Sequence, residues 1–412
     1  MTTTAPADPR LLLGVPDHGV GAYRSSGGYG PLPPAAAIVA AAERAGLRGA
    51  GGAGFPTAVK LDAVLSGTGP RAVVVNGEEG EPASIKDRWL MRNRPHLVLD
   101  GLRTAATAVG ADRLVAYVSD PESAAALRAA LAEAPAELAG ASVEEVDAAY
   151  VAGEETAVVN RLSGGEAKPL RKPPRPYEEG VAGRPTLVVN VETAARLALA
   201  VREGHDAGAT MLATVLIAGE AVLVEARRGA PLSAVVAEHP RWSSIEAGAV
   251  LVGGFAGGVW TTDILSAAVG HDSMRERGAL WGCGALIVLD RSECVVGAAL
   301  DVATYLRESS SGQCGSCVRG TQVVVEQLTR IANGTGSDDD LAQLERRAEA
   351  MAGRGNCALP DADSLLIGSL ITNFSAELLA HRERSCPGCR DITLDRPGGG
   401  AVTRFRAVLP PT

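Results

Sequence analysis

The first half of the chain alternates apolar runs of strand length with amphipathic stretches of helical period. Strands are predicted at 71–77 (RAVVVNG), 114–119 and 141–147, and helices at 34–46, 96–110, 122–134 and 191–204. The first of these strands is continuously apolar, as in a strand buried on both faces. This alternation of strand and helix predicts a parallel sheet covered by helices through about residue 200.

The pattern changes after residue 205. Short strands punctuated by glycine, with one short helix, run from about 210 to 290 and predict a small mixed β module. From Asp301 onward four helical segments follow, at 302–310, 318–334, 340–355 and 364–384. Helices of this length predict a four-helix bundle.

These changes divide the chain into five predicted segments. They are an extended lead-in rich in Pro, Gly and Ser (1–35), an α/β domain (36–205), the β module (206–295), the helical bundle (296–385) and a tail containing CPGC (386–412). With 412 residues, of which 46% are hydrophobic, the chain can bury several cores.

Charge and composition exclude several classes of function. A net charge of −9 and a pI of about 5.3 argue against a nucleic-acid partner. No apolar run approaches the roughly 18 residues of a membrane span, so we expect no direct membrane insertion. The N-terminus lacks the features of a secretory signal, which predicts a cytoplasmic, reducing location. There the seven cysteines are thiols or metal ligands rather than disulfides.

The strongest local signal is the glycine-rich segment GLRGAGGAGFPTAVK (46–60). Its four glycines at 49–54 bare the backbone, so that N–H groups can line a phosphate and Lys60 can supply positive charge. The spacing matches neither the dinucleotide fingerprint nor the Walker P-loop. A packing loop between helix and strand is the alternative for this segment taken alone.

Acidic and amide side chains recur where strands end. VNGEEGEPASIKDR (75–88) places four acids directly after a buried strand, where open α/β sheets bind ligands. Carboxylates there can bind ribityl or ribose hydroxyls, and Asn76 can address a heterocycle. YVAGEETAVVNRL (150–162) repeats the design, and a proline-stiffened loop (172–193) leads into a strand ending at Asn190. Each segment alone is also explained as a solvated turn; together they predict a cofactor site.

Three cysteines in the last third indicate a second kind of chemistry. Two residues separate Cys314 from Cys317, and 39 residues separate Cys317 from Cys357. Thiolates at such spacings can hold an iron–sulfur cluster, which normally takes four. Ser311 stands where the fourth thiolate is expected.

These motifs together resemble a known family, the flavin-binding F subunits of respiratory complex I and their relatives in NAD-reducing hydrogenases and formate dehydrogenases. The resemblance covers about 35–385 with the motifs in family order. The motif segments are RGAGGAGFPTAVK (48–60), NGEEGEPASIKDR (76–88), GEETA (153–157), PTLVVNVET (185–193) and the cluster positions Ser311, Cys314, Cys317 and Cys357. The β module then resembles the family's soluble-ligand-binding β-grasp (SLBB) domain.

The resemblance implies two resident cofactors, FMN and a [4Fe–4S] cluster, and a nicotinamide nucleotide, NAD(H) or NADP(H), as electron donor. The implied cofactor-binding residues are Gly49, Gly51, Gly52, Gly54, Phe55, Lys60, Asn76, Glu78, Gly153, Glu154, Glu155, Asn190 and Thr193. Glu79 and Glu81 would face the nucleotide as the catalytic pair. The implied partner is an electron carrier similar to a ferredoxin or to the E subunits of complex I, which leaves open a location peripheral to a membrane redox complex.

Several positions depart from the family pattern. Ala50 replaces a phosphate-directed arginine, and Val189 replaces an asparagine. Of three phenylalanines that surround the adenine in the family only Phe55 persists, because Ala63 and Arg175 occupy the other places. Each lost aromatic face removes stacking of about 0.5–1.5 kcal/mol, so we expect weaker NADH binding. Arg175 could instead pair with a 2′-phosphate and favour NADPH.

The fourth cluster ligand stays open at this stage. Ser311 could ligate as an alkoxide, Cys386 or Cys389 could be recruited from the tail, the cluster could hold three irons, or it could be lost. A reduced pair or a separate metal site is the other interpretation of the tail cysteines. Cys283 and Cys294 are expected to be small core residues, and no histidine is assigned a role.

Two hypotheses about function follow. The first is an NAD(P)H dehydrogenase-like oxidoreductase that passes electrons singly to a partner. The second is a descendant that keeps the fold without nucleotide chemistry, either non-catalytic or fed by a partner. The second is favoured by the substitutions at Ala50, Ala63, Arg175, Val189 and Ser311. The retained acidic and GEETA segments favour the first.

Overall fold

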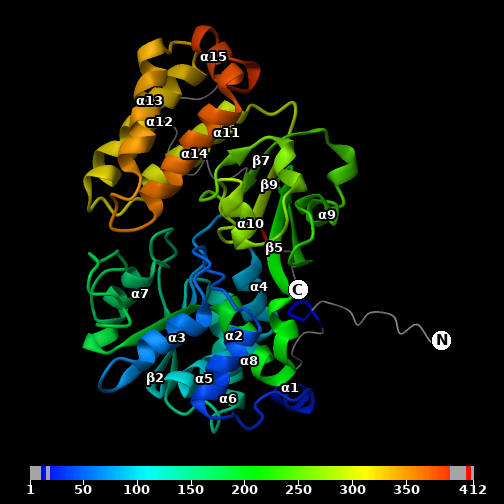
Figure 1. The fold of residues 1–412 in the computed structure, drawn as a ribbon, viewed down its shortest axis with the longest axis vertical. Coiled ribbons are helices and arrows are strands. Elements are labelled where there is room, and N and C mark those ends of the chain that lie inside the picture. The colour runs from blue at the N-terminus through cyan, green and yellow to red at the C-terminus, as the bar shows by residue number, and fades with distance from the viewer. Residues whose placement is uncertain (1–10, 15–18, 390–404, 410–412) are drawn as a thin grey trace, which may run out of the picture.

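The computed structural model describes residues 11–14, 19–389 and 405–409. Much of the predicted lead-in (1–10 and 15–18) and of the predicted tail (390–404 and 410–412) lies outside the described residues. Figure 1 shows three parts: an α/β domain at the bottom, a second sheet in the middle at the right, and a helical region at the top. The predicted boundary after 205 lies between a helix that ends at Glu203 and a strand that begins at Thr210, and the predicted start of the bundle at 296 lies one residue inside a helix that begins at Val295.

The α/β domain is built on a parallel sheet of four strands in the order β3-β2-β1-β4. The strands are β1 (Arg71–Gly77), β2 (Ala111–Val118), β3 (Ala141–Glu145) and β4 (Thr186–Asn190). The helices are α1 (Val20–Ser25), α2 (Ala35–Arg44), α3 (Thr57–Leu65), α4 (Lys86–Asn93), α5 (Pro95–Val109), α6 (Pro121–Glu133), α7 (Glu155–Leu162) and α8 (Val191–Glu203). The predicted parallel sheet is confirmed.

Alternation along β1 explains why the strand is apolar throughout. Val73 and Val75 pack with α2, α5 and α8 on one face of the sheet, whereas Val74 packs with Val158 of α7 on the other. A strand covered on both faces has no solvent-facing side to fill with polar residues. One correction concerns the lead-in, which contains the helix α1 because Tyr23 is buried and its hydroxyl donates to Asp100 at 2.9 Å.

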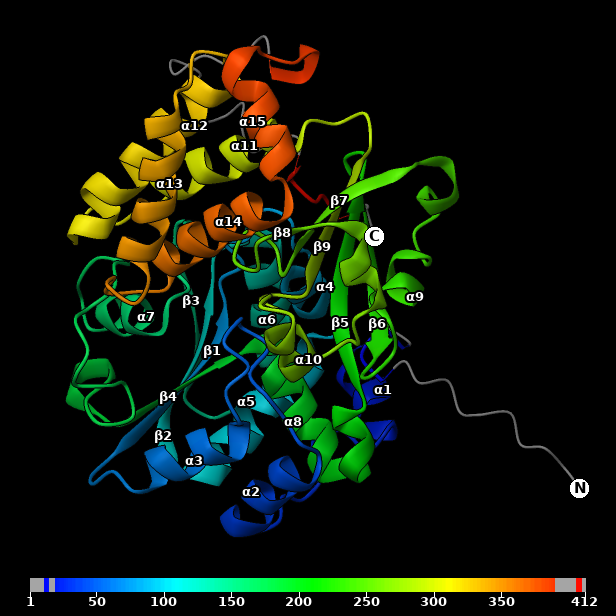
Figure 2. The same cartoon turned by 45° about the horizontal axis from the view of Figure 1, so that its top comes forward.

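The second sheet is mixed, in the order β6-β5-β9-β7-β8 with β5 and β9 parallel. Its strands are β5 (Thr210–Ile217), β6 (Glu220–Arg227), β7 (Ala247–Val252), β8 (Val259–Trp260) and β9 (Ala285–Asp290), with the short helices α9 (Leu232–Val236) and α10 (His271–Glu276). One face packs against α9 and the other against the helical region, as the turned view in Figure 2 also shows. This is the small mixed β module expected from the glycine-punctuated strands.

The helical region contains α11 (Val295–Glu308), α12 (Gln322–Ala332), α13 (Asp338–Met351), α14 (Leu359–Asn373) and α15 (Ser375–Glu383). The segment predicted as one helix over 364–384 is two helices, which corrects the count of four. The chain breaks at Phe374, where φ is −135° and ψ is 35°, and the Phe374 side chain is buried in the helical core. None of the described helices is long and apolar enough to cross a membrane.

Close contact between α5 and α8 depends on Gly101. A Cβ at this position would lie 2.2 Å from the carbonyl oxygen of Ala194 in α8. Because this oxygen belongs to the helix backbone, it cannot move away without distorting α8. We expect Gly101→Ala to destabilise the α/β domain by about 1–3 kcal/mol, although alanine is the better helix former. Gly368→Ala in α14 is the matched control, since a Cβ there meets nothing within 4 Å and should stabilise. Thermal unfolding followed by circular dichroism measures both, and equal melting temperatures for the two variants would contradict the packing argument.

Candidate functional site

The carboxyl ends of β1 and β4 form the edge on which the predicted cofactor residues meet. Asn76 and Asn190 are paired across these two strands. The Asn76 side-chain amide donates to the carbonyl of Gly153 at 2.8 Å, which joins this edge to the GEETA segment. Asn190 caps α8 by accepting from the N–H of Glu192 at 2.9 Å. Two segments distant in sequence are therefore fixed to one sheet edge.

The glycine-rich loop lies against the same edge. The N–H of Ala50 donates to the hydroxyl of Thr193 at 2.8 Å, and a Cβ at Gly51 would lie 3.5 Å from that of Asn190. Gly52 has φ of +118°, and a Cβ there would meet nothing within 4 Å. The loop thus exposes bare backbone to open space beside Asn190 and Thr193, as a phosphate-binding loop requires.

Residues of α10, a short helix of the second part, contact this loop. A Cβ at Gly54 (φ +63°) would lie 2.5 Å from the ring of His271 in α10. Arg275 donates to the carbonyl of Ala53 at 2.8 Å, and Arg48 pairs with Asp272 at 2.9 Å. The glycine at 54 is therefore required both by its backbone conformation and by the approach of the histidine.

The acidic segment after β1 is buried and held by protein donors. Glu78 accepts from the N–H groups of Gly80 at 3.1 Å and Ala149 at 3.3 Å. Glu79 accepts from Ser84 at 2.6 Å and from the Arg88 guanidinium at 3.0 Å. The three acids, Glu78, Glu79 and Glu81, therefore have fixed side chains rather than forming a solvated turn.

Glu81 points toward the second sheet. Its carboxylate accepts from the N–H of Phe255 at 3.1 Å, and a Cβ at Gly254 would lie 2.5 Å from its carboxyl carbon. Burial is the main reason that the pKa of Glu81 is raised to about 8, and burial likewise raises the pKa of Glu78 to about 8. The prediction that Glu79 and Glu81 face a nucleotide remains a prediction.

The GEETA segment begins α7 and carries two lysine contacts. Glu154 caps the helix by accepting from the N–H of Thr156 at 2.8 Å, and it pairs with Lys172 at 2.6 Å. Glu155 pairs with Lys60 at 3.1 Å. Burial opposes ionisation of Glu155, but the two ammonium groups outweigh it and lower its pKa. Lys60 is thus held by Glu155 next to the glycine-rich loop.

The cysteine motif approaches the GEETA segment. The Cys314 thiol contacts the Cys317 thiol and backbone N–H groups that include that of Asn356, next to Cys357. Cys357 interacts electrostatically with Cys314, Glu154 and Lys172. Cys317 lies in a single π-helical turn (Ser316–Thr321), a feature often found at functional sites. The three cysteines predicted to hold a cluster are near one another and near the predicted flavin edge, and the role of Ser311 stays a prediction.

The remaining cysteines correct two expectations. Cys294 was expected to be a small core residue and no histidine was assigned a role. Instead the sulfur of Cys294 lies 3.3 Å from Nε2 of His381 and 3.3 Å from the sulfur of Cys389, with Cys386 beside them. Sequence spacing could not show this group, because Cys294 precedes the other three by 87 residues or more. Only the close spacing of Cys386 and Cys389 in the CPGC segment indicated a separate metal site.

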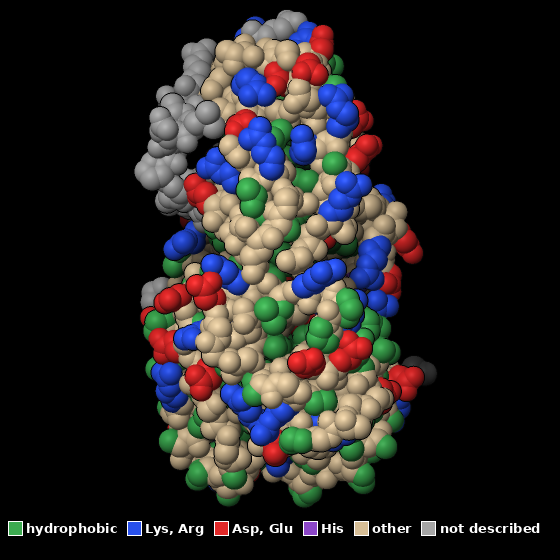
Figure 3. All heavy atoms as spheres, turned by 90° about the vertical axis from the view of Figure 1, so that its left-hand side faces the viewer, with side chains coloured by type: hydrophobic (Ala, Val, Ile, Leu, Met, Phe, Trp, Pro, Cys, Tyr) green, Lys and Arg blue, Asp and Glu red, His purple; other side chains and the backbone are tan. Residues whose placement is uncertain are grey.

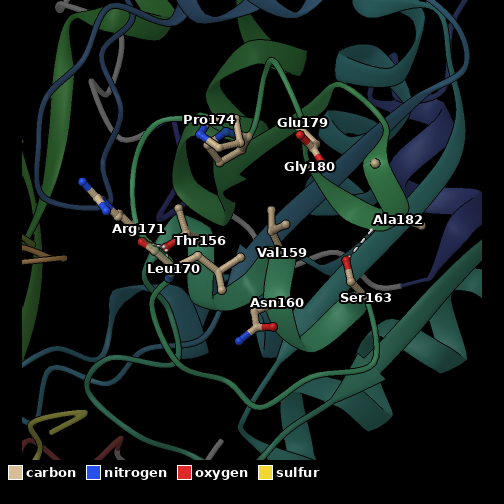
Figure 4. Close-up of a pocket in the computed structure, with 12 residues that line it drawn as sticks. Thr156, Val159, Asn160, Ser163, Leu170, Arg171, Pro174, Glu179, Gly180 and Ala182 are labelled. Carbon is tan, nitrogen blue, oxygen red and sulfur yellow. Dashed lines mark hydrogen bonds between the residues drawn. The ribbon is translucent and has the colours of Figure 1, made fainter. Parts of the chain in front are cut away.

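One cavity of about 280 Å³ lies on the outer side of α7 (Figure 4). Thr156 and Val159 line it from the helix, and Pro174, Glu179 and the segment around Ala182 close it. The N–H of Ala182 donates to the hydroxyl of Ser163 at 3.0 Å, as the dashed line shows. None of the residues predicted to hold FMN lines this cavity.

The residues on the sheet edge fit FMN. Bare backbone beside Gly52 and the ammonium of Lys60 suit its phosphate. Glu78 is the predicted contact of its ribityl hydroxyls, and Asn76 that of its heterocycle. Figure 3 shows Lys and Arg side chains spread over one face of the molecule, with Asp and Glu side chains among them. The donor set of Cys314, Cys317 and Cys357 fits an iron–sulfur cluster with one position not supplied by thiolate.

The raised pKa values make stability depend on pH. Glu78 has a pKa of about 8 when folded and 4.5 when unfolded, so its contribution is complete below about 4.5 and is lost as the pH rises to 8. We expect the free energy of unfolding to fall between pH 5 and 8, by up to about 1.4 kcal/mol per pH unit for each such group. Glu78→Gln should flatten this slope, whereas Glu349→Gln, at an exposed site, should not. Urea unfolding across this range measures it, and parallel curves for all three proteins would contradict the assignment.

Comparison with known proteins supports the same interpretation. The model of the Nuo51 FMN-binding domain matches residues 42–199, and that of the NADH-ubiquinone oxidoreductase-F iron–sulfur binding region matches residues 297–381. The chain is 32% identical to the second NADH-quinone oxidoreductase F subunit of Rhizobium meliloti, over 92% of this chain and 99% of that one. It is 29% identical to the NADP-reducing hydrogenase subunit HndC of Solidesulfovibrio fructosivorans, over 85% of this chain and 77% of that one.

A solved structure shares the fold. A chain of an NAD⁺-reducing [NiFe]-hydrogenase in the H₂-reduced state superposes with a TM-score of 0.76 at 30% identity. The match covers 86% of this chain and 63% of the length of the hydrogenase chain. With both family regions matched and a relative of nearly equal length, the chain belongs to the family of NADH-quinone oxidoreductase F subunits, the FMN- and iron–sulfur-binding subunits of such enzymes.

Proposed function

We propose that this chain is an oxidoreductase subunit that takes a hydride from a nicotinamide nucleotide at the carboxyl edge of its parallel sheet and passes electrons singly to a partner. The observation that carries the proposal is the convergence of the glycine-rich loop, Asn76, Gly153 and Asn190 on that edge. FMN supplies hydride acceptance and single-electron release, and a [4Fe–4S] cluster supplies electron carriage. The chain supplies binding and orientation.

Each segment has a distinct task in this proposal. The loop backbone at Gly51 and Gly52 and the ammonium of Lys60 bind phosphate. Asn76, Glu78, Glu154, Asn190 and Thr193 orient the rest of the flavin through groups already fixed by hydrogen bonds. Phe55, which is 51% exposed, offers a free aromatic face to the nucleotide. Glu79 and Glu81 would face the nucleotide, and hydrogen bonds from Ser84 and from the N–H of Phe255 fix their side chains.

Interactions between the α/β domain and the helical region support electron exit in that direction. Cys357 interacts electrostatically with Glu154 and Lys172, which belong to the predicted flavin edge. The Tyr305 hydroxyl of α11 donates to the carbonyl of Gly80 at 2.9 Å. A cluster on Cys314, Cys317 and Cys357 would therefore lie beside the flavin edge. We infer an acceptor similar to a ferredoxin or to the E subunits of complex I, and a cytoplasmic location, peripheral to a membrane redox complex.

A second candidate function is an electron-transfer subunit fed by a partner rather than by a nucleotide. The substitutions favour it: Ala50 removes a phosphate-directed cation, Ala63 and Arg175 remove aromatic faces, and Ser311 replaces a thiolate. The side chain of Arg175 acts electrostatically on Glu155, which places a cation near the carboxyl edge of the parallel sheet. This guanidinium could pair with a 2′-phosphate and so select NADPH over NADH.

Anaerobic purification followed by absorbance spectroscopy tests the proposal. We expect flavin bands with broad iron–sulfur absorption, and bleaching on addition of NADH or NADPH. Thr193→Val removes the hydroxyl that holds Ala50 and should lower FMN occupancy severalfold, whereas the exposed Lys168→Ala should leave it unchanged. A coloured protein bleached only by a reduced partner would support the second candidate, and a colourless protein that cannot be reconstituted would contradict both.

Replacing Ser311 by cysteine tests the cluster assignment. Thiolate is a stronger ligand for iron than the serine oxygen, so Ser311→Cys should raise the iron content per chain and the fraction of intact cluster. Ser310→Cys, one residue away, is the matched control and should change neither. Iron analysis with electron paramagnetic resonance of the reduced protein measures both variants. Equal iron content in the wild type and both variants would show that position 311 is not a ligand position.

A further inference from the structure

A second group of potential metal ligands lies apart from the predicted cluster motif. It comprises Cys294, His381, Cys386 and Cys389, and their ligand atoms all lie within 4.8 Å of one another. Cys294 is the N-cap residue of α11, with three residues between it and the end of β9 at Asp290, and His381 belongs to α15. Cys386 and Cys389 flank the turn that follows α15. Three parts of the chain thus bring one nitrogen and three sulfurs together.

The spacing of these atoms suits a single metal ion. The sulfurs of Cys294 and Cys389 are 3.3 Å apart, well beyond the disulfide bond length of about 2.05 Å. Four ligands at Zn–S distances of about 2.3 Å form a tetrahedron with edges of about 3.8 Å, close to the separations found here. An iron–sulfur cluster would place several iron atoms between the thiolates and hold them farther apart. The group is therefore sized for a mononuclear site.

Neighbouring groups orient the ligands. Nδ1 of His381 lies 2.7 Å from the carbonyl of Glu377 and donates to it, which leaves the lone pair of Nε2 directed at Cys294. The N–H of Gly297 donates to the sulfur of Cys294 at 3.3 Å. At Gly388 a Cβ would lie 3.2 Å from Cβ of Cys294 and 3.7 Å from the sulfur of Cys386. The turn between the two tail cysteines therefore fits closely over the site.

The surroundings are apolar. Cys389 is fully buried, and Cys294 and Cys386 pack against the core shared by the second sheet and the helical region. The four residues supply three thiolates and one imidazole, which make a complete tetrahedral set for a divalent ion. A closed, four-coordinate set of three cysteines and one histidine is characteristic of structural zinc.

We propose that Cys294, His381, Cys386 and Cys389 bind one Zn²⁺ ion in a closed tetrahedral site. The ion ties the turn after α15 to the junction of β9 and α11, and so fastens the C-terminal end of the helical region to the second sheet. This site is independent of the flavin edge and of Cys314, Cys317 and Cys357. It also assigns the CPGC pair to a separate metal site rather than to the predicted iron–sulfur cluster.

Metal analysis of the full chain tests the proposal. After purification under reducing conditions with zinc present, we expect one zinc per chain. The double variant Cys294→Ser/Cys389→Ser should lose the zinc while FMN and iron content stay as in the wild type. Cys283→Ser is the matched control, because Cys283 lies outside the group and should retain full zinc.

If the double variant does not fold, X-ray absorption spectroscopy of the wild-type protein tests the same ligand assignment. Extended X-ray absorption fine structure at the zinc edge should show three sulfurs at about 2.3 Å and one nitrogen at about 2.0–2.1 Å. Removing the ion with a chelator should lower the melting temperature, and adding zinc back should restore it. Absence of zinc, zinc with other ligands, iron at these residues, or a disulfide among these cysteines in the reduced preparation would each overturn the proposal.

Discussion

The structure depends on a chain of buried charges at the carboxyl edge of the parallel sheet. Lys86 is almost fully buried and pairs with Asp87 at 2.7 Å and with Glu192 at 3.3 Å. Glu192 in turn pairs with Arg196 at 2.9 Å. Burial alone would lower the pKa of Lys86, but the neighbouring carboxylates outweigh it and raise that pKa. Removing one partner would leave an unpaired buried charge, which typically costs about 3–5 kcal/mol.

This network connects the two sheets as well as ordering the edge. Glu192 also accepts from the N–H of Leu212 in β5 at 3.1 Å, and Arg196 reaches Thr210 at 3.0 Å. Asp87 accepts from the side chain of Asn190 at 2.6 Å, which fixes the residue beside the glycine-rich loop. The predicted cofactor edge is therefore held by a network of buried ion pairs and hydrogen bonds, so it needs little rearrangement to receive a planar ligand.

Much of the fold was predictable because its periodicity is strong. The run Ala72–Val75 is buried on both sides, which only a covered strand explains, and β1 has the bounds that its apolar pattern predicts. The break at Phe374 was not predictable, since the apolar pattern continues across it and neither Gly nor Pro marks it. The burial of Glu81 against the backbone N–H of Phe255 was not predictable either, because an acidic run of this kind is usually exposed to solvent.

The sequence by itself determined the family, the parallel sheet and the candidate flavin and cluster residues, because each rests on a motif that is contiguous in the chain or on a period of two or 3.6 residues. Tertiary structure alone decided which of these residues meet. Contacts between Ala50 and Thr193, or between Cys294 and His381, join residues separated by 143 and 87 positions. No local pattern encodes such pairs, since they follow from how sheets and helices pack. Cys294 therefore changed from an expected core residue to a proposed zinc ligand.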